Sequence, residues 1–256
     1  MRGSDMTSEP LTTASRLVAR GLVAGYLRGV DIPRGVSVEA PRGQVRCVLG
    51  PNGTGKSTLL KVLFGFLPPR DGEIRLDGQP LRSVGVHELG RHRVVYLPQR
   101  PSIFPYLSVE VNLRLGAWRY RGERRRVDEL VSRACEQFPV LRDRRRQPAG
   151  TLSGGQQRQL EIARSLMHDP AVLLIDEPTA GVEPRVAAVI YETIKSLAAQ
   201  GKAVLLVDQN IKRALEIADY VYVMRTGTVL SEGSREVFGD DTKALVSRWL
   251  YPSGNA

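Results

Sequence analysis

A glycine-rich loop constrains the fold of this chain more than any other feature of its sequence. Residues 50–57 read Gly-Pro-Asn-Gly-Thr-Gly-Lys-Ser and fit the pattern G-x-x-x-x-G-K-S/T. The apolar run Val45–Leu49 precedes them, and a helical pattern over Lys56–Phe64 follows them. The alternative is a glycine-rich turn with an incidental lysine. Because the strand–loop–helix context agrees with the motif, we expect loop amides and a helix N-terminus to face a bound phosphate.

Two further apolar runs predict the rest of the core. Ala171–Ile175 and Ala203–Val207 are rich in Val, Ile and Leu and do not alternate with polar residues, as in strands buried on both faces. A turn and a helical pattern follow each run, the first helix opening at Pro184 and ending before Gly201. This alternation predicts an α/β fold with a mostly parallel core sheet.

Two other kinds of segment flank this core. Residues 16–48 and 72–97 contain shorter strand patterns with Asp-Gly turn signals, which indicate an antiparallel β subdomain. Residues 100 to about 167 show no strand pattern and indicate an inserted helical subdomain. We expect a flexible N-terminus over 1–15 and a core formed by two segments, 16–98 and 168–240. A helical subdomain over 99–167 lies between these segments in the sequence, and a C-terminal helix or tail covers 241–256.

Bulk composition narrows the class of protein without deciding its function. In 256 residues, no apolar run approaches the roughly 20 residues needed to cross a bilayer, and the polar N-terminus is not expected to act as a secretory signal. Cys47 and Cys135 lack metal-like spacing and are expected to be reduced structural thiols. The net charge of +10 is concentrated in arginines over 119–126 and 142–146. A solvated helix face, a docking surface near a membrane and nucleic-acid binding all remain open for these arginines.

Two carboxylates at a predicted strand end complete a candidate catalytic site. Asp176 and Glu177 follow Ala171–Ile175 directly, and ligands bind at the carboxyl ends of strands in open α/β sheets. Lys56 is expected to bridge the β- and γ-phosphates, and Ser57 to ligate Mg²⁺. Asp176 is suited to holding Mg²⁺ and Glu177 to polarising the attacking water. The alternative is a solvated strand end.

Taken with Leu152-Ser-Gly-Gly-Gln156, the loop and the acidic pair resemble the nucleotide-binding subunit of ABC transporters, from about residue 16 to 237. The resemblance implies the P-loop NTPase fold of an ABC ATPase, with ATP and Mg²⁺ as ligands. It also implies a second ABC ATPase subunit, identical or different, membrane permease subunits and, indirectly, an extracytoplasmic substrate-binding protein. The implied location is peripheral, on the cytoplasmic face of the cell membrane, and no nucleic acid is expected.

The resemblance assigns further roles. Tyr26 matches the aromatic that stacks on adenine, with a core tyrosine as the alternative. Gln99 matches the loop glutamine that reaches Mg²⁺ and the attacking water, with an ordinary polar loop residue as the alternative. The segment Ile103–Ser108 matches the groove for a permease helix. The expected nucleotide-binding residues are Tyr26, Gly50, Pro51, Asn52, Gly53, Thr54, Gly55, Lys56, Ser57, Thr58, Ser153, Gly154, Gly155 and Gln156.

The segment Ser153–Gln156 has a physical reading of its own. A helix N-terminus with a hydroxyl and two glycines is an anion site. Because the chain already has one phosphate loop, we expect this second site to act on the γ-phosphate held by a partner. The alternative is a serine-capped helix with a glycine-rich start.

Two positions depart from the family pattern. Ala180-Gly-Val-Glu183 replaces the usual Ala-Leu-Asp, which leaves the role of Glu183 open. Gln209 stands where the family usually has a histidine that contacts the γ-phosphate. A glutamine amide donates a hydrogen bond but carries no positive charge, so we expect weaker transition-state stabilisation.

The ending Val207-Asp-Gln-Asn210 also resembles one subgroup, the second ATPase of branched-chain amino acid importers and related urea or amide importers. We therefore expect import of branched-chain amino acids. Export of a lipid or polysaccharide remains an alternative, as does a soluble ABC ATPase that acts on nucleic acid or the ribosome.

Overall fold

The computed structural model describes residues 15–27, 29–81 and 86–238. The flexible N-terminus expected over 1–15, apart from Ser15, and the helix or tail expected over 241–256 lie outside these residues. Within the described ranges, no helix is both long enough and apolar enough to cross a bilayer.

The centre of the described fold is a six-stranded sheet with the order β10-β9-β3-β8-β7-β6. Its strands are β3 (Val45–Leu49), β6 (Val94–Leu97), β7 (Val172–Asp176), β8 (Ala203–Asp208), β9 (Tyr220–Arg225) and β10 (Thr228–Ser234). β9, β3, β8, β7 and β6 run parallel, and β10 pairs antiparallel with β9. The expected mostly parallel core is therefore confirmed.

A smaller antiparallel sheet packs beside this core, as expected, with the order β2-β1-β4-β5. Its strands are β1 (Ser15–Val23), β2 (Arg34–Pro41), β4 (Asp71–Leu76) and β5 (Gln79–Pro80). Asp77 and Gly78 join β4 to β5 with positive φ angles of 48° and 78°, as a two-residue hairpin turn requires.

The extent expected for the antiparallel region was wrong at its end. Within 72–97, the described chain also contains the helix α2 (Val86–Arg91) and strand β6. β6 pairs parallel with β7, with Val94 opposite Val172, and so belongs to the central sheet. A four-residue strand whose partner is far away in sequence leaves no local pattern that distinguishes the two sheets.

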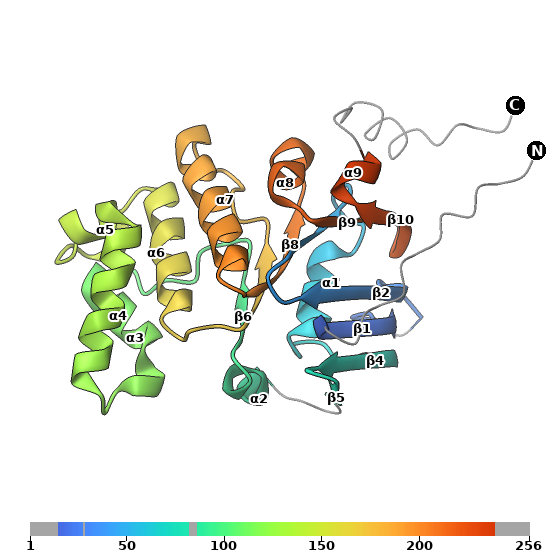
Figure 1. Cartoon of the computed structure of the whole chain (residues 1–256), viewed down its shortest axis with the longest axis horizontal. Helices are drawn as coiled ribbons and strands as arrows, with labels where there is room; N and C mark the ends of the chain where they lie inside the picture. Colours follow the sequence, from blue (N-terminus) through green and yellow to red (C-terminus); the bar gives the residue numbers. More distant parts are fainter. Residues whose placement is uncertain (1–14, 28, 82–85, 239–256) are drawn as a thin grey trace, which may run out of the picture.

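All of the chain between β6 and β7 consists of helices and loops, in agreement with the expected helical subdomain. The assignment of 99–167 as a separate unit stays a prediction. Figure 1 shows these helices grouped together at one end of the molecule, away from the antiparallel sheet. They are α3 (Val109–Gly116), η1 (Trp118–Tyr120), α4 (Arg124–Gln137), α5 (Pro139–Asp143), η2 (Ala149–Thr151) and α6 (Gly154–Leu166).

The central sheet is buried on both faces, which explains its continuous apolar strands. Along β3, Cys47 and Leu49 pack into a cluster with α6, α7 (Pro184–Ala199) and α8 (Ile211–Ile217). Val48 packs into the opposite cluster with α1 (Lys56–Leu63) and the antiparallel sheet. A short helix, α9 (Arg235–Phe238), follows β10. With both faces covered, ligands reach the sheet at its carboxyl edge.

Candidate functional site

The phosphate loop between β3 and α1 is held by close contacts that exclude larger side chains. Gly55 has a φ of 97°, and a Cβ there would lie 2.2 Å from Cγ2 of Ile32. A Cβ on Gly50 would lie 2.3 Å from the carbonyl oxygen of Met224, at the end of β9. The wrapped form of the loop therefore depends on glycine at both positions.

Lys56 is buried inside this loop. Its ammonium group donates hydrogen bonds to the carbonyl oxygens of Gly50 at 2.8 Å and Pro51 at 2.9 Å. Burial lowers the pKa of Lys56, and nearby carboxylates, Glu177 first among them, oppose this shift. The lysine thus stands between its own loop and the acidic strand end.

The other loop residues divide into buried and open positions. The hydroxyl of buried Thr54 donates to the carbonyl oxygen of Pro51 at 2.9 Å and closes the loop. Asn52 and Gly53 are exposed, whereas Thr58 is half-buried in α1. The exposed positions leave the outer side of the loop accessible to a ligand.

Ser57 and Asp176 meet although they are far apart in sequence. The Ser57 hydroxyl donates to Oδ1 of Asp176 at 2.9 Å, and the Tyr96 hydroxyl donates to Oδ2 at 3.1 Å. Burial raises the pKa of Tyr96, which keeps it a donor. A hydroxyl and a carboxylate that lie side by side offer the hard oxygen ligands that Mg²⁺ prefers, so these residues fit a Mg²⁺ site.

Gln99 and Glu177 form a second pair beside the first. The Gln99 amide donates from Nε2 to Oε2 of Glu177 at 2.7 Å. Burial raises the pKa of Glu177, whereas Lys56 and the Gln99 hydrogen bond lower it. Glu177 also has a φ of 42°, a left-handed conformation that is uncommon for a side chain of this size.

At the end of β8, Asp208 organises the backbone around Gln209. Oδ1 of Asp208 accepts hydrogen bonds from the backbone amides of Gln209 at 2.8 Å and Asn210 at 2.9 Å. Oδ2 accepts one from the Tyr191 hydroxyl at 2.7 Å. The Gln209 side chain is exposed and makes no hydrogen bond to any described residue, so it is free to meet a ligand.

Tyr26 lies on the surface. Its exposed fraction is 63%, and the Lys61 ammonium group lies 5.8 Å from the centre of its ring. This exposure argues against the core tyrosine considered above.

Ser153–Gln156 begin α6 with a capping box. The Ser153 hydroxyl accepts from the Gln156 amide at 3.4 Å, and the Gln156 side chain accepts from the Ser153 amide at 3.1 Å. A Cβ on Gly154 would have no neighbour within 4 Å, whereas one on Gly155 would lie 3.1 Å from Val186. Figure 1 shows α6 well apart from α1, and no hydrogen bond between described residues joins this segment to the phosphate loop.

Sequence reasoning missed one buried charge that ties these parts together. Arg158 in α6 is 2% exposed and donates to the carbonyl oxygens of Pro178 at 2.9 Å and Asp176 at 3.2 Å. It also donates to the carbonyl oxygen of Pro98 at 2.5 Å and pairs with Glu161. In sequence, an Arg–Glu pair three residues apart resembles a solvated helix face, so no local signal distinguished it.

Of the hollows that flank the helical subdomain, two are also lined by residues outside it. We call the first the apolar groove; it encloses about 770 Å³ and is lined chiefly by Phe64, Val94, Tyr96, Phe104, Leu115 and Trp118. Of the segment Ile103–Ser108, Phe104 lines this groove, while Ile103 packs on the core.

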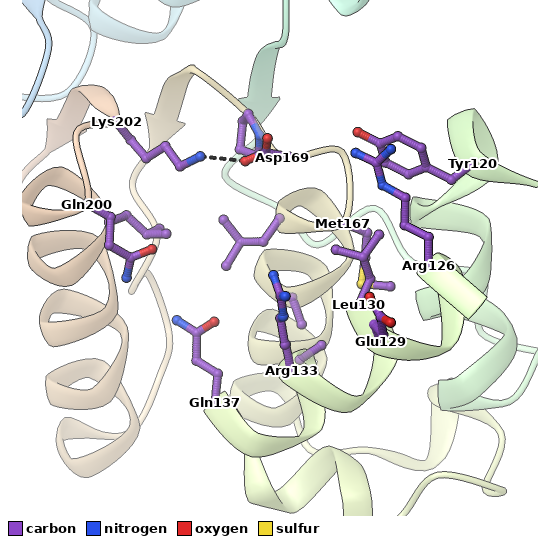
Figure 2. A pocket seen from close by; sticks show the side chains of 15 residues that line it. Tyr120, Arg126, Glu129, Leu130, Arg133, Gln137, Met167, Asp169, Gln200 and Lys202 are labelled. Carbon is purple, nitrogen blue, oxygen red and sulfur yellow. Dashed lines mark hydrogen bonds and ion pairs between the residues drawn. The ribbon is translucent and has the colours of Figure 1, made fainter. Parts of the chain in front are cut away.

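The second hollow, of about 440 Å³, lies between α4, α6 and the end of α7 (Figure 2). Figure 2 shows Arg133 and Gln137 on one side of it and the Lys202–Asp169 ion pair on another. None of the expected site residues lines this cavity. The candidate site is therefore the carboxyl edge of the central sheet.

Comparison with known proteins shows the family of the chain. The family model described as "ABC transporter" matches residues 33–180. The probable branched-chain amino acid transport ATP-binding protein LivF of Archaeoglobus fulgidus is 38% identical over 83% of this chain and 89% of its own length. The lipopolysaccharide export ATP-binding protein LptB of Acidithiobacillus ferridurans is 35% identical over 88% of this chain and 92% of its own length. Among solved structures, cbiO1 of the cbiONQ transporter from Clostridium perfringens aligns with a TM-score of 0.81 and 28% identity, over 93% of this chain and 96% of that one.

Proposed function

The chain belongs to the ABC transporter family as an ATP-binding ATPase subunit, and we propose that it hydrolyses MgATP in a head-to-tail pair to drive import of branched-chain amino acids. One observation carries the catalytic part of this proposal. Ser57 contacts Asp176, Gln99 contacts Glu177, and Lys56 lies beside both carboxylates at one edge of the sheet.

Each residue has a chemical task in this proposal. Lys56 and the loop amides bind the β- and γ-phosphates, and Ser57, Asp176 and Gln99 would hold Mg²⁺. The metal, when bound, neutralises charge on the phosphate oxygens. Glu177 orients the attacking water and accepts its proton, a task suited to a carboxylate whose pKa is raised by burial.

The open start of α6 supports the pairing of two chains. Ser153 and Gly154 are exposed, and the helix α6 that they begin lies apart from α1 in Figure 1. A helix N-terminus favours an anion, and the γ-phosphate held by a second chain is the anion that the motif order suggests. Tyr26, on the surface, is assigned to the adenine ring.

Transport requires a membrane subunit, and the apolar groove is its proposed binding site. The groove lies between α2, α3 and β6, and it is lined by Tyr96 and Phe104, which stand on either side of Gln99 in the sequence, so a helix inserted there would contact the segment that bears the site glutamine. The chain is then a peripheral subunit on the cytoplasmic face of the membrane, and the extracytoplasmic binding protein acts through the permease.

Similarity to known proteins supports branched-chain amino acids as the substrate, and it also supports lipid export as a second candidate function. The LivF-type relative and the Gln209 ending favour import of branched-chain amino acids, with a urea or amide importer close behind. LptB matches nearly as well over a greater share of its own length, which favours lipid export as the alternative. Co-purification of the chain with its permease, followed by uptake assays in vesicles, separates import from export.

The ATPase site is tested by Glu177→Gln. The variant keeps the shape of the side chain and an acceptor for Gln99, so it should bind ATP as tightly as the wild type. Its kcat should fall about a thousandfold, because the proton acceptor is lost. Glu192→Gln, an exposed change on α7, is the matched control and should keep full activity. Full hydrolysis by Glu177→Gln would reject Glu177 as the base.

A further inference from the structure

A group of exposed arginines around Trp118 takes no part in the chemistry proposed above. It occupies the turn that joins α3 to α4, where residues 118–126 contain five arginines and one glutamate. We call Trp118, Arg119, Arg121, Arg124 and Arg125 the arginine edge. All five are exposed, and Trp118 has 59% of its surface accessible.

Most of the charge on the arginine edge is not neutralised. Among the described residues, Arg119 and Arg124 form no ion pair. The Arg121 guanidinium lies 5.4 Å from the centre of the Trp118 ring. Arg125 alone of these arginines has a carboxylate within reach, at 3.2 Å on the same helix, and exposed pairs of this kind contribute little. The edge therefore presents a cationic surface to an anionic partner.

The edge also has an apolar component. A shallow hollow of about 380 Å³ is lined by apolar and arginine side chains together, namely Val111, Leu115, Trp118 and Val127 with Arg114, Arg121 and Arg124. Arginines mixed with apolar side chains match a partner that combines anionic groups with hydrocarbon. Tryptophan beside cationic residues is typical of the interface between membrane and water.

The position of the edge indicates which way it faces. Leu115 and Trp118 line both this hollow and the apolar groove, so the two surfaces adjoin. The orientation rests on the proposed function, in which the apolar groove receives the permease. A surface next to the permease contact is turned toward the membrane that holds the permease.

We propose that the arginine edge binds anionic lipid headgroups of this membrane, with Trp118 entering the headgroup layer. The membrane supplies both features that the edge requires, namely a negative surface and an apolar boundary. An acidic protein segment would meet the arginines but gives no reason for an exposed indole among them.

The test measures flotation of the full chain with vesicles of phosphatidylcholine, with and without phosphatidylglycerol. The wild type should float only with the anionic vesicles. Arg121→Gln/Arg124→Gln/Arg125→Gln should weaken this binding about a hundredfold at low salt, since each arginine near an anionic surface contributes roughly fivefold. Arg119 is left intact because it also lines the groove.

A matched control comes from the second arginine cluster. Arg142→Gln/Arg144→Gln/Arg146→Gln removes the same number of positive charges. These arginines lie near the other end of α3, since the backbone amides of Val109 and Glu110 donate hydrogen bonds to the carbonyl oxygens of residues 147 and 145. This control should bind vesicles as the wild type does. Equal loss in both variants would show a net-charge effect and overturn the proposal.

Two further readouts separate the possible outcomes. In a Trp249→Phe chain, Trp118 is the only tryptophan, and its emission should shift to the blue with anionic vesicles. A contrary outcome is that the wild type neither floats with the vesicles nor changes its emission, while the Arg121/Arg124/Arg125 variant loses permease binding. This combination would overturn the proposal and assign the arginine edge to an acidic protein segment. Preference for duplex DNA over vesicles would also overturn the proposal. The Arg121/Arg124/Arg125 variant should hydrolyse ATP at the wild-type rate. A failure of the lipid-binding proposal is thereby distinguished from a failure of the ATPase assignment.

Discussion

The side-chain amide of Gln99 donates a hydrogen bond of 2.7 Å to the carboxylate of Glu177, which joins the loop after β6 to the end of β7. This bond lowers the pKa of Glu177 against the effect of burial, which raises it. The segment that opens the helical subdomain therefore affects the protonation of the proposed base.

The first prediction concerns Gln99→Ala. Loss of the hydrogen bond raises the pKa of Glu177 further, and hydrolysis requires the unprotonated carboxylate, which exists above that pKa. The acidic limb of the kcat profile should therefore move to higher pH, and kcat at its plateau should fall about tenfold. Steady-state ATPase assays across the acidic and neutral range measure both effects. Gln137→Ala, an exposed change on α4, should leave the profile unmoved; an unshifted limb in Gln99→Ala would contradict the coupling.

The second prediction concerns the buried guanidinium of Arg158. Arg158→Met leaves Glu161 as a buried charge without its partner and three carbonyl oxygens without a donor. The free energy of unfolding should fall by about 3–5 kcal/mol. Urea unfolding measures this, with Arg125→Met as an exposed control expected to change stability by less than about 0.5 kcal/mol. A loss as small as the control's would show that Arg158 is dispensable for the packing of α6.

The third prediction concerns the phosphate loop. Gly55→Ala places a Cβ 2.2 Å from Cγ2 of Ile32 at a φ of 97°, so the loop must open. ATP affinity, measured by calorimetry, should fall by at least about tenfold, because the loop amides no longer converge. Gly90→Ala in α2 meets no atom within 4 Å and should leave affinity unchanged. Wild-type affinity in Gly55→Ala would argue against the loop as the phosphate site.

The fourth prediction concerns Gln209→His. Asp208 fixes the backbone at this position, while the side chain is exposed and can be exchanged. A protonated imidazole adds a positive charge near the γ-phosphate, so kcat should rise by about threefold to tenfold. The gain should diminish as pH rises through the histidine pKa, near 6.5 in the absence of shifts. An increase that does not depend on pH would favour a packing effect over charge.

Local sequence patterns identified the elements whose environment is uniform. β3, β7 and β8 are buried on both faces and appear as unbroken apolar runs, and the glycine-rich loop has its own signature. β6 was assigned to the wrong sheet and no strand was expected over β9, because their parallel partners β7 and β3 lie far away in the chain. Strand pairing between distant segments is a property of the whole fold and leaves little trace in four to six residues. β10 was missed although it pairs with β9, its neighbour in the chain.

The same distinction holds within the site. Residue type and motif order were sufficient to bring Ser57, Asp176 and Glu177 together. The network of Arg158 was not predictable, because a buried ion pair and an exposed one have the same spacing along a helix. Burial, which decides between them, comes only from tertiary packing.

The separation of Ser153 from the phosphate loop of its own chain has a kinetic consequence. Under the proposed pairing, every catalytic centre draws on two polypeptides, so the specific ATPase rate should grow with protein concentration until dimers saturate. Dilution should reduce the rate per molecule reversibly. An excess of chains mutated at both Lys56 and Ser153 should poison wild-type chains, because neither centre of a mixed pair is then complete. A cell that made such chains in excess would therefore silence the transporter.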